Sequence, residues 1–184
     1  MDNQKRNTSE DQNSDRYLTG MFENRESAEK VYTGLQERGY TKDDINLVMS
    51  DETRKKYFDD KDDITDLGSK ALEGAGAGSA IGGTVGAIAG IIAAIGTSIL
   101  IPGLGLVIAG PIAGALAGAG AGGLTGGIIG ALIGAGIPED RAKVYEAGVK
   151  DGRILIGLKP KSQEDANYFE EDWRKNKGED VYVY

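Results

Sequence analysis

Two short apolar runs flank a helical pattern near the start of the chain. Residues 17–22 and 45–49, YLTGMF and INLVM, are rich in apolar and β-favouring residues, which predicts two strands. Asn24 is placed to cap a helix between them, and Gly39 is placed to end it. The apolar residues of this helix recur at the i, i+3, i+4 and i+7 positions, at Ala28, Val31, Tyr32 and Leu35. Residues 16–50 are therefore expected to form the first half of a domain.

The end of the chain repeats this alternation of helix and strand. Pro138 suits the first turn of a helix, and Gly152 is placed to end it. Residues 153–158, RILIGL, predict a third strand, Ser162 is placed to cap a further helix, and the alternating VYVY of residues 181–184 predicts a fourth strand. The buried faces of the two helices are expected at Ala142, Tyr145 and Val149 and at Ala166, Phe169 and Trp173.

This order of elements indicates an α+β domain. The sequence strand, helix, strand, then helix, strand, helix, strand predicts a ferredoxin-like split βαβ sandwich, with helices on one face of a four-stranded sheet. The same chain order also allows other arrangements of the sheet. Residues 137–184 form the second half, and an acidic linker (51–70) and an apolar insertion (71–136) separate the halves. Residues 1–15 are expected to be a disordered polar tail, because they contain nothing that could bury against a core.

Most of the insertion lies within a stretch, residues 74–138, that contains no charged residue. Residues 100–111, LIPGLGLVIAGP, predict a turn because of their prolines and glycines. Two apolar α-helices are left, over 71–100 and 110–136, which together predict a helical hairpin. From Ala80 to Ile101 the first helix would be about 33 Å long at ~1.5 Å per residue, enough to cross a hydrocarbon core of about 30 Å.

Glycine occupies every fourth position over much of both predicted helices. On a helix this spacing follows one ridge of small residues, where two backbones can approach closely and cross in the right-handed sense. We interpret this ridge as a glycine zipper that serves the partner helix of the hairpin and neighbouring subunits. Its helix-packing and oligomerisation residues are Gly74, Gly78, Gly82, Gly86, Gly90, Gly110, Gly114, Gly118, Gly122, Gly126, Gly130 and Gly134.

Two other interpretations of the glycine-rich insertion fit less well. Gly118, Gly120 and Gly123 match the G-x-G-x-x-G pattern of dinucleotide sites, but no predicted strand precedes them, and that motif depends on a strand–turn–helix context. A solvated coil is disfavoured because bulky apolar residues such as Ile91 and Leu132 recur throughout the insertion.

The linker is rich in aspartates, which makes a cation site worth testing. An EF-hand loop that starts at Asp60 would place Ile64 at its fifth position and Thr65 at its sixth, where an oxygen ligand and a glycine are needed. The pattern fails, and we interpret the aspartates as a solvated linker without a metal.

The composition of the chain limits the kinds of catalysis and binding that it can carry out. The chain has a net charge of −8, an isoelectric point near 4.7, no cysteine and no histidine. Thiol chemistry is excluded, and the commonest general base and zinc ligand are missing. No basic stripe is present to bind nucleic acid. We therefore expect a protein that is not an enzyme, has no cofactor and binds no nucleic acid, and we identify no small-molecule substrate.

The flanking segments resemble a known family. FENRESAEKVYTGLQERGYTKDDINLVMSDE and GIPEDRAKVYEAGVKDGRILIGLKP are similar to bacterial general stress proteins with a heat-induced stress (YflT-like) domain, in versions interrupted by a glycine-zipper segment. The resemblance implies a stress-associated bacterial protein with no catalytic residues to carry over. The matching residues are Phe22, Ala28, Leu35, Gly39, Tyr40, Ile45, Val48, Ile137, Pro138, Ala142, Tyr145, Gly152 and Leu155.

Together these patterns predict self-assembly through the hairpin. The first hypothesis is a membrane-associated homo-oligomer whose hairpin lies in or on the lipid bilayer, with the αβ domain in the cytoplasm. The alternative is a cytoplasmic, soluble oligomer whose glycine-rich hairpins form a dry protein core. The apolar turn at residues 100–111 argues against simple spanning, because a turn exposed beyond the membrane is normally polar.

Overall fold

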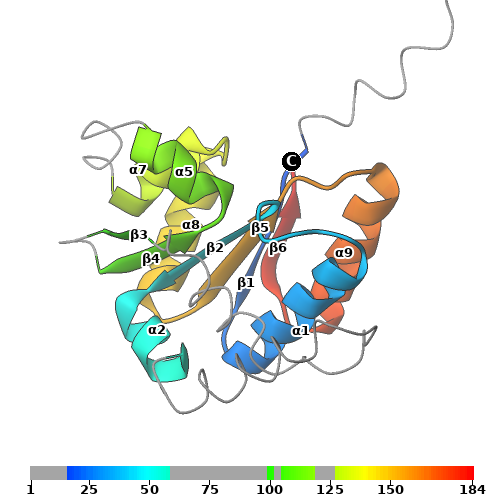
Figure 1. Cartoon of the computed structure of the whole chain (residues 1–184), viewed down its shortest axis with the longest axis horizontal. Coiled ribbons are helices and arrows are strands. Elements are labelled where there is room, and N and C mark those ends of the chain that lie inside the picture. Colours follow the sequence, from blue (N-terminus) through cyan, green and yellow to red (C-terminus); the bar gives the residue numbers. More distant parts are fainter. Residues whose placement is uncertain (1–15, 59–98, 102–104, 119–126) are drawn as a thin grey trace, which may run out of the picture.

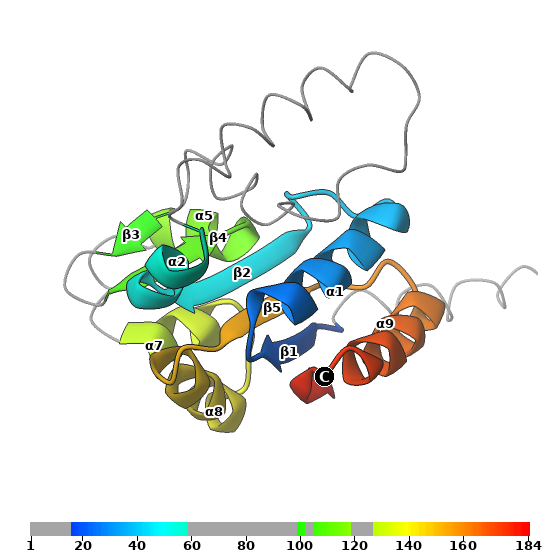
Figure 2. The same ribbon diagram turned by 90° about the horizontal axis from the view of Figure 1, so that it is seen from below.

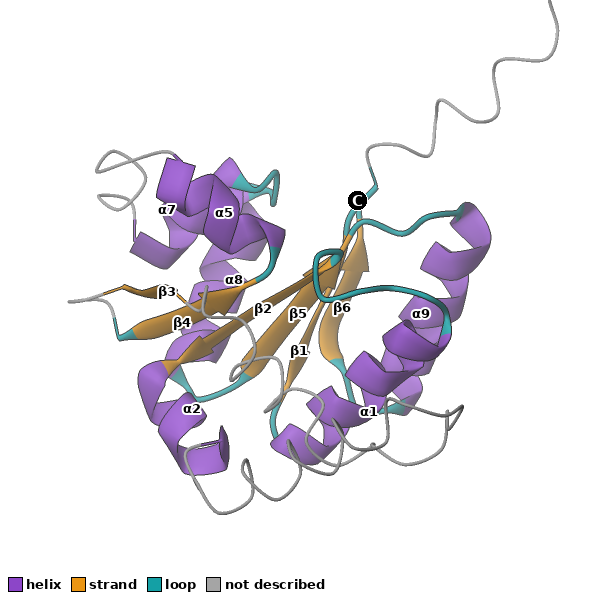
Figure 3. Ribbon diagram, viewed as in Figure 1, coloured by secondary structure: helices purple, strands orange, loops and turns teal. Residues whose placement is uncertain are grey.

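The computed structural model of the chain describes residues 16–58, 99–101, 105–118 and 127–184. Within these ranges the protein is an α+β structure of strands and helices in alternation (Figures 1 and 3). The elements are β1 (Leu18–Phe22), α1 (Arg25–Glu37), β2 (Ile45–Ser50), α2 (Asp51–Phe58), β3 (Ile99–Ile101), β4 (Leu106–Ala109), α5 (Pro111–Gly118), α7 (Gly127–Gly134), α8 (Glu139–Lys150), β5 (Ile154–Leu158), α9 (Gln163–Lys175) and β6 (Glu179–Val183).

The strands form one six-stranded sheet in the order β3-β4-β2-β5-β1-β6, and every neighbouring pair is antiparallel. Strand β5 lies between β1 and β2, so that Leu155 faces Met21 on one side and Val48 on the other. Between β1 and β6 the register shifts, and Gly20 lies opposite two residues of β6, Asp180 and Val181. This shift is a β-bulge, which fits the positive φ of 48° at Asp180.

Helices cover both faces of the sheet (Figures 1 and 2). Helices α1 and α9 pack on one face, over a core that includes Leu18, Phe22 and Trp173. Helices α5, α7 and α8 pack on the other, over a core that includes Met21 and Tyr145. The expectation that the helices share one face is therefore wrong for α8. Alternate residues of the central strands are buried on opposite faces, which gives a strand two apolar sides and leaves room for a helix layer on each.

The local signals of the flanking segments are confirmed. The Asn24 side chain accepts a hydrogen bond from the backbone N–H of Ser27 at 3.0 Å, and the Ser162 hydroxyl accepts one from the N–H of Asp165 at 3.0 Å. Gly39 and Gly152 follow the ends of α1 and α8 with φ of 79° and 92°. These left-handed conformations explain why glycine ends each helix.

The insertion differs from the expected hairpin of two helices. Residues 99–101 and 106–109 are strands, and β4 pairs with β2, so the segment expected to be a turn extends the sheet by two strands (Figure 3). The helix expected over 110–136 is described as two helices, α5 and α7. Gly127 has a φ of 62°, which a continuous right-handed helix cannot contain. Most of the other expected helix, residues 71–98, lies outside the described residues.

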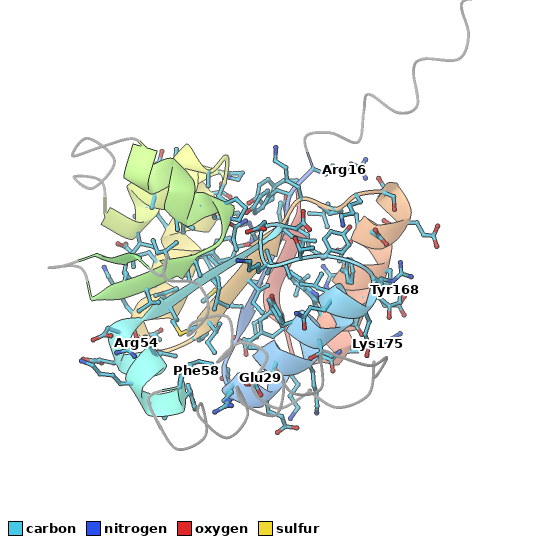
Figure 4. All side chains as sticks on the ribbon, viewed as in Figure 1. Arg16, Glu29, Arg54, Phe58, Tyr168 and Lys175 are labelled. Atoms are coloured by element: carbon cyan, nitrogen blue, oxygen red, sulfur yellow. The ribbon has the colours of Figure 1, made fainter. Side chains whose placement is uncertain are left out.

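The expected linker also begins differently. Its first eight residues form α2, whose Phe58 packs into the same core as α1. Arg25 of α1 joins the two helices, because it donates a hydrogen bond to the Tyr57 carbonyl of α2 at 2.8 Å. It also donates one to the buried Glu29 carboxylate of its own helix at 2.7 Å (Figure 4 labels Glu29 and Phe58). The rest of the linker, with its aspartates, and the tail at residues 1–15 lie outside the described residues.

Candidate functional site

The glycines expected to form the zipper fall into two groups. Five lie in the described residues: Gly110 precedes α5, Gly114 and Gly118 lie in α5, and Gly130 and Gly134 lie in α7. The others lie outside the described residues, namely Gly74, Gly78, Gly82, Gly86, Gly90, Gly122 and Gly126.

Gly110 has a different role from the one expected of it. Its φ is 92°, and a Cβ at this position would overlap the carbonyl oxygen of Ile45 in the neighbouring strand β2. The residue is therefore not part of a helical ridge. It lets the backbone turn from β4 into α5 while passing directly against β2.

Three large side chains of α5 and α7 pack into the domain. Burial against α8 and the sheet places Ile112 of α5 and Ile128 and Leu132 of α7 in the same core as Val48 and Tyr145. These side chains belong to the core of the αβ domain, and the described part of the insertion is a layer of that domain.

Two of the described glycines lie on the exposed side of these helices. Gly114 and Gly134 are exposed, and a Cβ added at either would meet no described atom within 4 Å. Ile133, beside Gly134, is 43% exposed, an unusually large fraction for an isoleucine in a segment without charges. We refer to these exposed positions, Gly114 of α5 and Ile133 and Gly134 of α7, as the glycine face. Nothing in the described chain uses it for packing between α5 and α7.

A buried asparagine anchors α5 to the sheet. Asn46 of β2 is only 4% exposed, and its Oδ1 atom accepts a hydrogen bond from the backbone N–H of Ile112 at 2.7 Å. Its Nδ2 atom donates to the Tyr17 hydroxyl and to the Gly157 carbonyl, the latter at 3.3 Å. Because a buried amide left unpaired is costly, these bonds specify where α5 begins. A polar residue inside the apolar run INLVM was a signal of this role, but nothing nearby in the sequence identified its partners.

Several hydroxyl groups lie around this anchor on the same face of the sheet. Thr19 and Tyr145 form a hydrogen bond of 2.6 Å, and the Tyr145 hydroxyl also donates to the Asp180 carbonyl at 3.2 Å. The Tyr17 ring stacks on that of Tyr184, with centroids 6.0 Å apart. Burial is the main cause that raises the pKa of both Tyr17 and Tyr145 above the usual range, so these phenols stay protonated at neutral pH and do not act as bases.

The described ranges offer little for catalysis or metal binding. No group of three or more aspartate and glutamate side chains in them is arranged to hold a metal ion. No helix in these ranges is both long enough and apolar enough to cross a lipid bilayer. The most unusual surface is the glycine face, which combines small residues, an exposed isoleucine and the absence of charge.

Comparisons with models of protein families, with curated proteins and with solved structures found no match to this chain. The function is therefore argued from the residues and their contacts.

Proposed function

We propose that this protein is a non-enzymatic, stress-associated protein that assembles with copies of itself through the glycine face of α5 and α7. The observation that carries the proposal is the contrast between the buried and the exposed residues of these two helices. Ile112, Ile128 and Leu132 are buried in the domain, whereas Gly114 and Gly134 are exposed with no described atom against them. A helix surface without side chains lets a second helix approach closely, which gains dense van der Waals contact.

The composition of the outer side of α5 and α7 favours contact with another protein surface over exposure to water. Helices that face water normally carry charged residues on the outer side, and α5 and α7 have none. Glycine is also a poor helix former, so a helix that keeps several of them gains something else at those positions. A neighbouring copy of the same face supplies that gain.

The fold supports the resemblance from which the stress-associated role comes. Among the four strands expected from the flanking segments the order is β2-β5-β1-β6, the antiparallel order of a ferredoxin-like split βαβ sandwich. Matching residues such as Ala28, Leu35 and Leu155 are buried, and Gly39 and Gly152 end helices. The shared residues are thus those that a common fold would need.

Of the two environments expected for the assembly, the packing of α5 and α7 favours the oligomer held together by protein contacts in the cytoplasm. A hairpin inserted in lipid would turn Ile112, Ile128 and Leu132 towards acyl chains, whereas here they fill the core beside the sheet. Association with the bilayer is the second candidate, and the exposed Ile133 in a charge-free segment favours it.

The test is the double substitution Gly114→Leu with Gly134→Leu. Both positions are helical and open, so leucine should leave the fold intact and improve helix propensity, while its bulk blocks close approach. Ala147→Leu is the control, because it places a leucine at an exposed position of α8 outside the glycine face. Molar mass is measured by light scattering after size-exclusion chromatography without detergent.

We expect the parent chain and Ala147→Leu to form the same oligomer and the double variant to be monomeric and folded by circular dichroism. An unchanged oligomer in the double variant would overturn the proposal. A parent chain that is monomeric alone but floats with phospholipid vesicles would favour the membrane candidate, and a monomer that ignores vesicles would exclude both.

A further inference from the structure

A cavity of about 310 Å³ lies where α5 meets the sheet. Its described lining comes from the residue before β1, from β2 and the loop before it, from the start of α5, and from the residues that follow α7 and β5. The volume is at the lower end of the range of about 300–1,000 Å³ that is typical of small-molecule sites. The lining residues used below are Tyr17, Asp43, Asp44, Asn46, Ile112, Ala135 and Lys159.

The inner part of this cavity presents one unused hydrogen-bond donor. The backbone N–H of Ile112 can only donate, so the Asn46 atom that faces it must be the amide oxygen. The amide nitrogen then donates to the Tyr17 hydroxyl, which uses a lone pair of that oxygen. The hydroxyl proton of Tyr17 has no acceptor among the described residues, although the residue is only 6% exposed. A buried donor of this kind costs free energy until an acceptor reaches it.

The described hydrogen-bond partner of the Tyr17 hydroxyl is the uncharged Asn46 amide. Burial is the cause that raises the pKa of the Tyr17 phenol. Asp43, Asp44 and Lys159 also line the cavity. Asp44 pairs with Lys161 at 3.7 Å, and the other two carry opposite charges and are exposed. An ion of either sign would therefore meet an uncharged inner part and a mouth with no excess of its opposite charge.

We propose that this cavity binds a small, uncharged, mostly apolar molecule that carries one carbonyl or hydroxyl oxygen. The oxygen accepts the free proton of the Tyr17 hydroxyl, and the apolar body lies against Ile112 and Ala135. Asn46 is a positioning residue, because its bonds hold the Tyr17 hydroxyl and the first turn of α5 in place around the cavity. The proposal is independent of self-assembly, since every residue of the site belongs to one chain.

Three probes of similar size separate the features of this ligand. Acetophenone offers a neutral carbonyl, ethylbenzene removes the acceptor, and benzoate adds a charge. Binding is measured by ligand-observed NMR titration of the full chain, which works for a monomer and for an oligomer alike. We expect saturable binding of acetophenone and markedly weaker binding of ethylbenzene and benzoate. Saturable binding of none of the three, or benzoate binding as tightly as acetophenone, would overturn the proposal.

Two variants test the assignment of the residues. Tyr17→Phe keeps the ring and removes the donor, and we expect acetophenone to bind about fivefold more weakly, close to the binding of ethylbenzene. Tyr182→Phe is the matched control, because it removes a phenol from the exposed edge strand β6 outside the cavity lining and should change nothing.

Ala135→Leu covers the case in which Tyr17→Phe disturbs the fold, because it fills the cavity without removing a hydrogen bond. Binding of acetophenone should be lost in this variant. Full binding in a folded Ala135→Leu chain would place the ligand elsewhere and overturn the site.

Discussion

Helices α9 and α7 both bury large apolar side chains against the sheet, but their outer surfaces differ in kind. On α9, Arg174 pairs with Glu170 and Lys175 with Glu171, both at 2.7 Å and one helical turn apart. On α7 the outer residues are Ile133 and Gly134, and no charged residue is present. The two layers thus share a way of packing inward and differ in what they present outward. The comparison separates a surface made for water from one made for contact.

The largest expected effect on stability comes from a substitution in α9, the helix with the charged outer surface. Trp173 of α9 is fully buried, meets Phe22 edge to face at 5.7 Å and lies against Gly20, where there is no room for a Cβ. Trp173→Ala should therefore lower the free energy of unfolding by about 3–5 kcal/mol. Urea denaturation is measured in the Gly114→Leu, Gly134→Leu background, so that assembly does not contribute to stability. A loss below about 1.5 kcal/mol would show that α9 is not a main support of the fold.

A smaller effect on stability is expected from the equivalent change in α7, the helix without charged residues. Leu132 of α7 is buried beside Ile137, and Leu132→Ala should cost about 2–3 kcal/mol in the same background. Hydrogen exchange shows which elements lose stability in this variant, and we expect faster exchange in α5 and α7 with little change in β1. Equal loss of protection in β1 would contradict the idea that the inserted helices form a layer added to an independent core.

The smallest expected effect is a dependence of the stability on pH that arises in α9. Partial burial is the main cause that raises the pKa of the Asp172 carboxyl in α9. The folded state then binds a proton more readily than the unfolded state, so its stability falls as pH rises through that interval. Asp172→Asn should therefore stabilise the protein at pH 7, by a few tenths of a kcal/mol for this half-exposed group, and the gain should disappear in acid.

Glu171→Gln is the matched control for that pH dependence, with the opposite sign. A hydrogen bond from Lys175 is the main cause that lowers the pKa of the Glu171 carboxyl, so this charge favours the folded state above the carboxyl pKa and that benefit is lost in acid. Thermal melts of both variants at pH 3, 5 and 7 measure the two trends. If both variants shift stability in the same direction at pH 7, burial of Asp172 is not what distinguishes the two groups.

The features predicted best from the sequence are those that depend only on residues close together in the chain. Helix caps at Asn24 and Ser162 and helix ends at Gly39 and Gly152 need only a few adjacent residues, and all four are confirmed. The face on which α8 packs was not predictable in this way. Its apolar stripe, which includes Tyr145, fits either face of a sheet whose strands are apolar on both sides.

The insertion shows the same limit more strongly. Prolines and glycines near β4 favour a turn, yet the run LVIA becomes a strand because β2 offers it a partner more than fifty residues earlier in the chain. Gly110 fits the glycine spacing but serves a close approach to Ile45. The Asn46 anchor likewise depends on Ile112, which only the folded chain brings near. Long-range partners, and not local propensity, decided each of these features.

The bulge between β1 and β6 also bears on which kinds of aggregate this protein can form. A sheet ends in a strand whose outward N–H and C=O groups can recruit a strand from another molecule, and a regular, apolar edge does so most readily. Strand β6 is short, is interrupted opposite Gly20, and begins with the charged residues Glu179 and Asp180. It is therefore a poor template for the growth of fibres at this end of the sheet. A chain with so much apolar and glycine-rich sequence thus protects itself, along β6, from amyloid-like stacking.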